Sequence, residues 1–477
     1  MSLQKTREAI QATSRKEVFD EALQKAKAVQ PKLNAMVTFC EYEDGHLATA
    51  DQNSPFYGVP IVLKDNINTK GIKTTASSRI LDNYIPVYDA TIVEKLKKAG
   101  ALLVGKASLD ELGMGGSNRT AYTGPVHNPY DLDRISGGSS GGSAVLVASG
   151  VVPFAVGSDT GDSVRKPASY NHIVGVKPTY GRISRYGIIP YASSLDHVGY
   201  FTRNIVDAAA ALTVLAGRDD HDMTSSFRAV EDYAKQLNHN LSGKRIAVLQ
   251  NVTDAVKDPA ILQQFEELLN KLKAAGAIVE PVRFNEHLMK ALLPVYFIIS
   301  NAEASANHSN LDGIRFGMQE DGSSVEEVMV HSRTKGFSSF IRQRFLIGSY
   351  ALFAKNQEKV LRKAQKVRRL IVDELKQVLA NYDVVLTVAA GSGAPLIEST
   401  ASEDRLSEEY LIAENHLVLG NFSGYPSMTL PLGFDSEQMP VGINITANPF
   451  AEQMMFDIGA GMEELLGNQD RIQEVEA

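Results

Sequence analysis

Residues 136–148 read SGGSSGGSAVLVA, in which four glycines and four serines run directly into an apolar segment. Glycines let the backbone turn tightly and expose its N–H groups, and the N-terminus of a following helix favours negative charge. The stretch therefore predicts a ligand-holding loop at the start of a buried helix, Ala144–Ala148. A flexible linker is the alternative, but linkers are rarely joined to apolar helices. A phosphate-binding loop is disfavoured, because it requires a lysine where this sequence has Ser143 and Ala144.

A second polar turn follows. Residues 157–168 read GSDTGDSVRKPA and present Ser163 after a glycine-containing turn. Consecutive backbone N–H groups in such a turn can stabilise the oxyanion that forms when a serine attacks a carbonyl, so Ser163 is a candidate nucleophile. Upstream, the apolar run 57–63 is typical of a buried strand and ends at Lys64. Strand ends are where α/β enzymes place their chemistry, although a solvated surface lysine is the alternative for Lys64.

Helix and strand patterns alternate along much of the chain. Ser14 and Glu17 form a capping box at the start of an apolar helical stripe, and Gly100 ends a helix that begins at Thr91. The alternation predicts βα units and an α/β fold. We find no repeat or long linker, so we expect a single domain, 1–477, with an N-terminal helical segment over about 1–50. The other expected helices are 204–216, 259–274, about 356–381 and 451–466, and the expected strands are 101–104, 245–249, 277–282, 384–388, 427–432 and 442–447.

The composition is that of a folded, soluble protein, with 44% apolar and 22% charged residues. The single Cys40 excludes a disulfide within the chain and a multi-cysteine zinc site. The ten histidines include no His-Glu-x-x-His pattern, so we expect no catalytic metal. No signal peptide or membrane span is recognisable, which predicts a cytoplasmic protein without membrane contact. A net charge of −8 disfavours unaided binding of a polyanion, so any RNA partner would need another subunit.

A Ser-His-Asp triad is an alternative to chemistry based on Lys64, because two histidines and two aspartates lie near Ser163 in sequence. Sequence proximity does not decide a triad, however. Neither histidine falls in a Gly-x-Ser-x-Gly elbow or another acyl-transfer motif, which disfavours this alternative. The residues concerned are His172, His197, Asp159 and Asp196.

Several motifs in a fixed order resemble the amidase signature family. Besides the segments 136–148 and 157–168, the motifs are GVPIVLKDN at 58–66, GVKPTYGRISRYG at 175–187 and SLD at 194–196. The resemblance therefore covers at least residues 57–200. The resemblance implies the family's fold, a large mixed and mostly parallel central sheet covered by helices on both faces. It also implies a catalytic set of a lysine, a serine in a cis peptide and a nucleophilic serine. These fall on Lys64, Ser139 and Ser163.

This catalytic set is chemically consistent. Burial away from anions would lower the pKa of Lys64, so that its amine could accept a proton near neutral pH. Ser139 would relay the proton, and Ser163 would attack the amide carbon and form an acyl ester. The backbone N–H groups of Thr160, Gly161, Asp162 and Ser163 would form the oxyanion hole.

The sequence departs from the family pattern at two positions in this turn. Asp162 replaces the usual second glycine, and Lys166 stands where a neutral residue is more usual. A carboxylate beside an oxyanion hole opposes the charge that forms in the transition state. We expect Asp162 to turn away from the hole and to pair with Lys166. Asn171 and His172 also replace the usual Cys-Gly, a substitution that the sequence alone does not explain.

Further motifs resemble the glutaminase subunits of tRNA-dependent amidotransferases. This resemblance implies release of ammonia from glutamine, a heterotrimer with B and C subunits, and contact with tRNA only through a partner. It implies no cofactor in this chain, with ATP and Mg on the partner. The alternatives are an independent amidase for small carboxamides and a catalytically weakened structural subunit. The motifs are 303–317, 332–337, 344–351 and 363–368.

Glutamine carries an α-carboxylate and an α-ammonium, so its pocket should contain both charges. The resemblance suggests Arg344 for the carboxylate and Glu414 for the ammonium, although Arg344 could also be an exposed helix residue. Backbone groups of Met114, Gly115 and Gly116 are expected to line the same pocket. The stretch 353–361 departs from the tyrosine-rich sequence of these subunits, which affects expected contacts with a partner. A basic run that follows is interpreted as a solvated helix face; it comprises Arg362, Lys363, Lys366, Arg368 and Arg369.

Overall fold

The computed structural model describes residues 2–399 and 408–475. Its centre is an eleven-stranded sheet with the order β1-β3-β2-β6-β8-β7-β12-β13-β11-β9-β10, and β4 and β5 form a separate two-stranded sheet. The strands are β1 (Met36–Phe39), β2 (Pro60–Lys64), β3 (Leu102–Ala107), β4 (His127–Asn128), β5 (Asp131–Ile135), β6 (Phe154–Asp159), β7 (Val174–Lys177), β8 (His197–Thr202), β9 (Arg245–Leu249), β10 (Ile278–Val282), β11 (Val384–Val388), β12 (Ser427–Phe434) and β13 (Pro440–Ala447).

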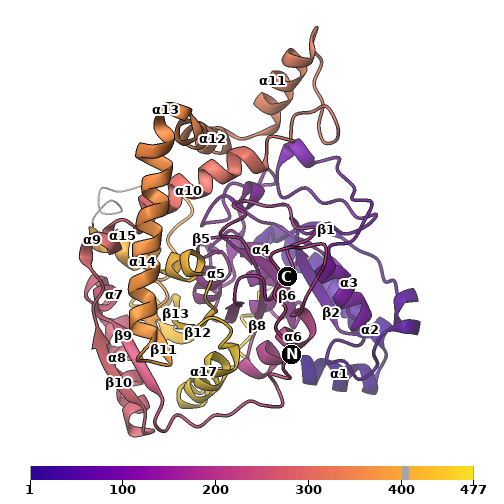
Figure 1. Cartoon of the computed structure of the whole chain (residues 1–477). Coiled ribbons are helices and arrows are strands. Elements are labelled where there is room, and N and C mark those ends of the chain that lie inside the picture. The colour runs from indigo at the N-terminus through magenta and orange to yellow at the C-terminus, as the bar shows by residue number, and fades with distance from the viewer. Residues whose placement is uncertain (1, 400–407, 476–477) are drawn as a thin grey trace.

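Helices surround this sheet (Figure 1). They are α1 (Leu3–Ala12), α2 (Arg15–Leu33), α3 (Thr91–Lys98), α4 (Gly141–Ala148), α5 (Arg165–Tyr170), α6 (Ile205–Leu215), α7 (Gln250–Ala255), α8 (Pro259–Ala274), α9 (Glu286–Lys290), α10 (Leu292–Asn307), α11 (Val325–Gly336), α12 (Ser339–Leu352), α13 (Ala354–Asn356), α14 (Lys363–Leu379), α15 (Glu408–Asn415), α16 (Leu419–Ser423) and α17 (Glu452–Leu466). Among the described residues, none of the helices has the length and apolar character needed to cross a membrane.

The sheet is mixed, as expected, but parallel pairing does not predominate. Four neighbouring pairs are parallel, at β3–β2–β6 and β11–β9–β10. The other six pairs are antiparallel and include the continuous run from β6 to β11. The βα alternation read from the sequence holds only toward the two ends of the sheet. In the middle, β12 and β13 are joined by a short connection, which permits only antiparallel pairing.

Most of the elements that the sequence predicts are present near the predicted ranges, but others, such as β1, α10 and α12, were not predicted. The Ser14 hydroxyl accepts a hydrogen bond from the Glu17 N–H, as the capping box predicts. The strands β9 and β11 and the helix α8 have the predicted bounds. The helix expected over about 356–381 is divided, because a π-helical segment at Gln357–Arg362 precedes α14. The basic run begins at Arg362 of the π-helical segment and continues on α14. It is exposed as interpreted, except that the Arg368 guanidinium donates to the carbonyls of Ser194 and Phe422.

Alternate residues of β2 pack into two different cores, which places helices on both faces of the sheet. Ile61 and Leu63 belong to one core, with residues of α3 and α6. Val62 belongs to the other, with residues of α2 and α4. Side chains of a strand alternate between faces, so Lys64 follows Val62 toward α4. Each buried aliphatic side chain of this size contributes about 1.5–3 kcal/mol, and both cores therefore fix the register of β2.

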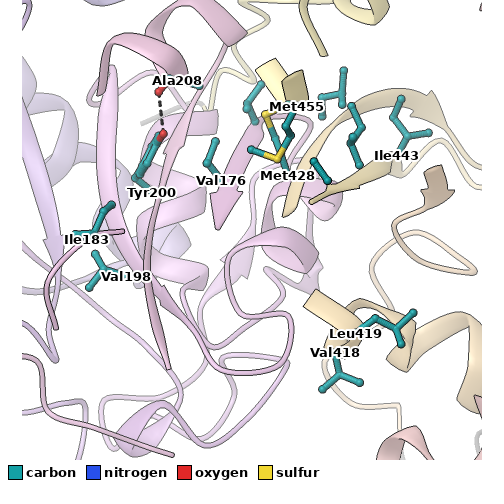
Figure 2. Packing of buried hydrophobic residues seen from close by; sticks show 14 of the residues in the cluster. Val176, Ile183, Val198, Tyr200, Ala208, Val418, Leu419, Met428, Ile443 and Met455 are labelled. Carbon is teal, nitrogen blue, oxygen red and sulfur yellow. Dashed lines mark hydrogen bonds between the residues drawn. The ribbon is translucent and has the colours of Figure 1, made fainter. Parts of the chain in front are cut away.

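The core behind the antiparallel strands is closed by α6 and α17. Figure 2 shows Met428 of β12 beside Met455 of α17. It also shows the hydroxyl of Tyr200, on β8, directed at α6, where it donates to the Ala208 carbonyl at 2.8 Å. Tyr200 is fully buried, so this bond satisfies a polar group that would otherwise be costly. The packing holds β8 against β6, the strand that leads into the second polar turn.

Candidate active site

Lys64 lies at the carboxyl end of β2 and is completely buried. Its amine nitrogen lies 2.8 Å from the hydroxyl oxygens of Ser139 and Ser140 and 2.9 Å from that of Ser158. Burial lowers the pKa of Lys64 to about 7, although Asp110, Asp159 and Asp196 oppose the shift. Lys64 is therefore not a solvated lysine, and a substantial fraction of its amine is uncharged at neutral pH.

The loop at 136–143 wraps the N-terminus of α4 and presents Ser139 to Lys64. The Gly138–Ser139 peptide bond is cis. The N–H of Gly138 donates to the Gly116 carbonyl at 2.9 Å, which joins this loop to a neighbouring one. A Cβ on Gly138 would lie 2.1 Å from an Asp110 carboxylate oxygen, so only glycine fits there. The glycines of the loop thus serve close packing around the buried serine.

Ser163 lies in the turn between β6 and α5 and is almost fully buried. An internal ion pair fixes this turn: the Arg165 guanidinium donates to Asp159 at 2.9 Å and to the Gly161 carbonyl at 2.9 Å. Burial alone would raise the pKa of Asp159, but the Arg165 charge holds it well below its usual range. The Asn421 side chain also bonds both members of the pair. The shape of the turn is therefore set by contacts outside the serine itself.

The backbone N–H groups of residues 160–163 donate no hydrogen bond to any group in the described part of the chain. They are therefore available to an oxyanion. The Ser140 N–H donates to the Ser163 carbonyl at 3.2 Å, which brings the loop at 136–143 next to the turn that contains Ser163. Between residues 2 and 399, where both serines lie, no hydrogen bond directly joins the Ser139 and Ser163 hydroxyls, whereas the bond from Lys64 to Ser139 is formed.

A cavity of about 170 Å³ opens beside this turn. Asp162 and Arg344 both line it, so it contains one carboxylate and one guanidinium. The Arg344 Nη1 atom is buried and has no hydrogen-bond partner among the described residues. Its guanidinium lies over the rings of Phe297 and Phe340, at 4.3 and 4.8 Å from their centres. The remaining lining residues are Gly115, Gly116, Gly161, Tyr191, Leu293, Tyr296, Phe297, Asn415 and Val418.

The sequence profile described as Amidase matches residues 17–456. The chain belongs to the amidase family. One similar amidase is the A subunit of glutamyl-tRNA(Gln) amidotransferase from Lactobacillus acidophilus, which is 41% identical over 433 residues, or 90% of this chain and 88% of the relative. A crystal structure of the protein of the same name from Thermotoga maritima is 35% identical with a TM-score of 0.83, covering 100% of this chain and 98% of that one.

More distant amidases share the fold. A peptide amidase from Stenotrophomonas maltophilia is 26% identical, with a TM-score of 0.81 over 99% of this chain and 98% of that one. These similarities confirm the amidase fold that the motifs at 57–200 imply. In the part of this amidase that the structure describes, no group of three or more histidine, cysteine, aspartate or glutamate residues could hold a metal ion.

Only some of the other residues expected in the pocket line the cavity of this amidase. Gly115 and Gly116 line the cavity, whereas Met114 is buried in the core behind them. Glu414 is not among the lining residues, although its neighbour Asn415 is. Both Glu414 carboxylate oxygens are occupied, one by the Gly391 N–H at 2.9 Å and the other by the Lys166 amine at 2.7 Å.

The expected pairing of Asp162 with Lys166 is a long contact. The Lys166 amine lies 3.9 Å from the nearest Asp162 oxygen, compared with 2.7 Å from Glu414. Burial raises the pKa of Asp162 to about 6, although Lys166 opposes the shift. The Asp162 carboxylate is therefore mostly ionised at neutral pH and is only weakly compensated.

The two histidines near Ser163 in sequence make packing and backbone contacts in this amidase. His172 stacks on Phe434 with ring centres 5.1 Å apart, and a nitrogen of His197 lies 2.7 Å from the Leu195 carbonyl. Burial lowers the pKa of both. Asp196, the remaining acid considered for a triad, accepts the Thr160 hydroxyl at 2.7 Å. These contacts leave neither histidine bonded to Ser163 and disfavour the Ser-His-Asp alternative.

Sequence reasoning missed several residues that shape the site. Ser140 and Ser158 hold the Lys64 amine, and both lie in the motifs already recognised. Asn171 donates to the Ser136 and Pro167 carbonyls at 2.7 and 2.8 Å, which ties the Gly/Ser loop to α5 and explains an amide at that position. The sequence around Asn421 does not indicate its role, because that role depends on a contact with Asp159, 262 residues earlier in the chain.

Proposed function

We propose that this amidase hydrolyses the carboxamide of glutamine through a γ-glutamyl ester on Ser163, as the ammonia-releasing subunit of a tRNA-dependent amidotransferase. One observation carries the chemistry: the buried Lys64 amine lies 2.8 Å from the Ser139 hydroxyl, next to the Ser163 turn. The similarity to amidotransferase A subunits over about nine-tenths of the chain supports the biological role.

The uncharged Lys64 amine serves as the base. A proton passes from Ser163 to Ser139 while Ser139 gives its own proton to Lys64, and the Ser163 oxygen forms a bond to the amide carbon. Rotation of a serine hydroxyl or closer approach in the substrate complex completes this path, since such bonds often tighten only when substrate is bound. The relay then returns a proton to the departing nitrogen, and ammonia leaves. Water attacks the ester by the reverse path and releases glutamate.

The free N–H groups of Thr160, Gly161, Asp162 and Ser163 stabilise the tetrahedral intermediate. A single donor of this kind contributes about 3–4 kcal/mol in other hydrolases. The Arg165–Asp159 pair acts indirectly, because it holds the turn that presents these donors. Preorganisation of this kind avoids the cost of reorienting dipoles during the reaction.

Arg344 supports an α-amino acid as substrate. Its guanidinium lines the cavity beside the turn, and one of its nitrogens has no hydrogen-bond partner in the described part of the chain. Guanidinium groups bind carboxylates with two parallel hydrogen bonds, which suits the α-carboxylate of glutamine. The ammonia would pass to B and C partner subunits in the cytoplasm, where ATP and Mg on a partner support amidation of tRNA-bound substrate. The net charge of −8 agrees with a tRNA contact made by the partner rather than by this chain.

The decisive experiment traps the covalent intermediate. The protein is incubated with radiolabelled glutamine, quenched in acid and digested, and the labelled peptide is mapped. Label on the peptide that contains Ser163, and none in a Ser163→Ala variant, is the expected result. Label elsewhere, or glutamine hydrolysis that persists in Ser163→Ala, would reject this mechanism.

Asp162 supports one alternative role for this chain, that of a structural subunit. A carboxylate beside the oxyanion hole could weaken catalysis and leave a chain that mainly holds an amidotransferase complex together. Measuring glutaminase activity with and without copurified partner subunits distinguishes the two roles. A structural subunit would remain inactive in both cases.

A further inference from the structure

The cavity beside the catalytic turn contains an anion that the mechanism above does not use. Asp162 lines it together with Arg344, and the Asp162 side chain is 26% exposed. No hydrogen bond from the described residues reaches either of its carboxylate oxygens, and the nearest cation, the Lys166 amine, lies 3.9 Å away. A carboxylate in such a place can accept a charged donor from a ligand.

The other carboxylate near the cavity is already neutralised. Glu414 accepts the Lys166 amine at 2.7 Å, the Tyr170 hydroxyl at 3.3 Å and the Gly391 N–H at 2.9 Å. Lys166 also donates to the Glu414 carbonyl at 2.6 Å. Burial alone would raise the pKa of Glu414, but the Lys166 charge and these bonds hold it below its usual range. Glu414 therefore has a full set of protein partners and does not face the cavity.

We propose that Asp162 is the specificity-determining residue that binds the α-ammonium of the substrate, while Arg344 binds its α-carboxylate. This inference rests on glutamine being the substrate. The pairing of Lys166 with Glu414 removes Glu414 from this role, and Asp162 takes it over from a position inside the oxyanion turn. The site then selects zwitterionic α-amino acid amides over amides that lack the α-ammonium.

Because Asp162 lies in the oxyanion turn, the charge of the bound substrate affects the stability of the transition state. An unpaired carboxylate next to the free N–H groups of residues 160–163 opposes formation of the oxyanion. A bound ammonium cancels that charge at the moment of reaction. An amide without an ammonium leaves it uncompensated, so discrimination should appear in kcat as well as in KM.

The test compares glutamine with glutaramic acid, which is glutamine without its α-amino group, using the full-length chain. The ratio of kcat/KM for glutamine to kcat/KM for glutaramic acid is measured in the wild type, in Asp162→Asn and in the matched control Glu414→Gln. Loss of one charged hydrogen bond predicts that Asp162→Asn lowers this ratio by roughly 10- to 100-fold. Glu414→Gln should change the ratio much less. An unchanged ratio in Asp162→Asn, or a larger fall in Glu414→Gln, would overturn the assignment.

Binding measurements keep the test decisive if Asp162→Asn is too slow to assay. Calorimetry gives the Kd of both ligands for Ser163→Ala and for Asp162→Asn/Ser163→Ala. The added substitution should weaken glutamine binding by a similar factor and leave glutaramic acid binding unchanged. Equal Kd values for glutamine in the two variants would reject the role of Asp162 while leaving glutamine as the substrate. A wild-type chain that neither hydrolyses nor binds glutamine, with or without its partners, would instead reject the proposed function.

Discussion

The amine nitrogen of Lys64 lies 2.8 Å from the hydroxyl oxygen of Ser139, and both residues are shielded from solvent. This contact joins a strand end to a loop 75 residues later in the chain. Because water is excluded, the charged form of Lys64 is disfavoured, and the lysine can exchange a proton with the serine.

Replacing Lys64 by arginine should lower kcat strongly, because a guanidinium stays protonated at all accessible pH values. General acid–base catalysis of this kind contributes about 10²- to 10⁴-fold, so the loss of kcat should fall in that range. Single-turnover release of ammonia from glutamine measures it. Lys64→Met is the control for packing, because it removes the amine and keeps most of the volume; it should be equally inactive with an intact fold. Wild-type turnover in Lys64→Arg would exclude the amine as base.

The rate should depend on pH through the protonation of Lys64. Burial lowers the pKa of Lys64 to about 7, and only the uncharged amine acts as base. Activity is therefore present above that pKa and is lost as the pH falls through it. We expect kcat/KM for glutamine to fall about tenfold per pH unit below about pH 7 and to level off above it. A profile that is flat between pH 5 and 9 would contradict a lysine base.

Lys166→Gln should depress turnover. The substitution removes the cation that neutralises Glu414 and partly compensates Asp162, and it leaves two carboxylates near the oxyanion hole. We expect a fall in kcat of roughly tenfold, equivalent to about 1.4 kcal/mol. Adding Asp162→Gly to this variant should restore part of kcat for glutaramic acid, because one of the two charges is removed. For glutamine the same addition should lower kcat/KM further, because it also removes the carboxylate proposed to bind the α-ammonium. Wild-type rates in the single variant would show that Lys166 has no electrostatic role at the turn.

Asp159→Asn should destabilise the protein strongly, because it leaves the fully buried Arg165 without its counter-charge. Breaking a buried pair in this way costs about 3–5 kcal/mol. Urea unfolding should show a lower midpoint with an unchanged slope. The exposed pair Arg369–Asp373 supplies the control, since Asp373→Asn should cost less than about 1 kcal/mol. Similar losses in the two variants would mean that the pair does not hold the turn.

Residues inside local motifs could be proposed for the site from the sequence, and their catalytic roles stay predictions. Lys64, Ser139 and Ser163 could be named from three short segments, and the structure brings these segments together. Long amphipathic elements such as α8 were also predictable, because periodicity over many residues is a strong signal. The short strands β6, β7 and β8 were missed, since a stretch dense in glycine and serine carries little hydrophobic pattern.

Contacts between distant segments could not be predicted. Glu414 was expected to bind substrate, but its nearest partner is Lys166, 248 residues earlier in the chain. The local sequence around either residue gives no sign of the other, because the pairing depends on how α5 and α15 meet in the folded chain. The assignment of charges in the pocket therefore required the structure.

Because the side chains of β2 alternate between two cores, the register of this strand also decides whether Lys64 can act. A slip of this strand by one residue would turn every side chain to the opposite face, and Lys64 with them. The amine would then point away from α4 and its serines, and the chain would be inert rather than an enzyme of altered selectivity. Hydrolytic competence is thus acquired only when both layers of packing are complete.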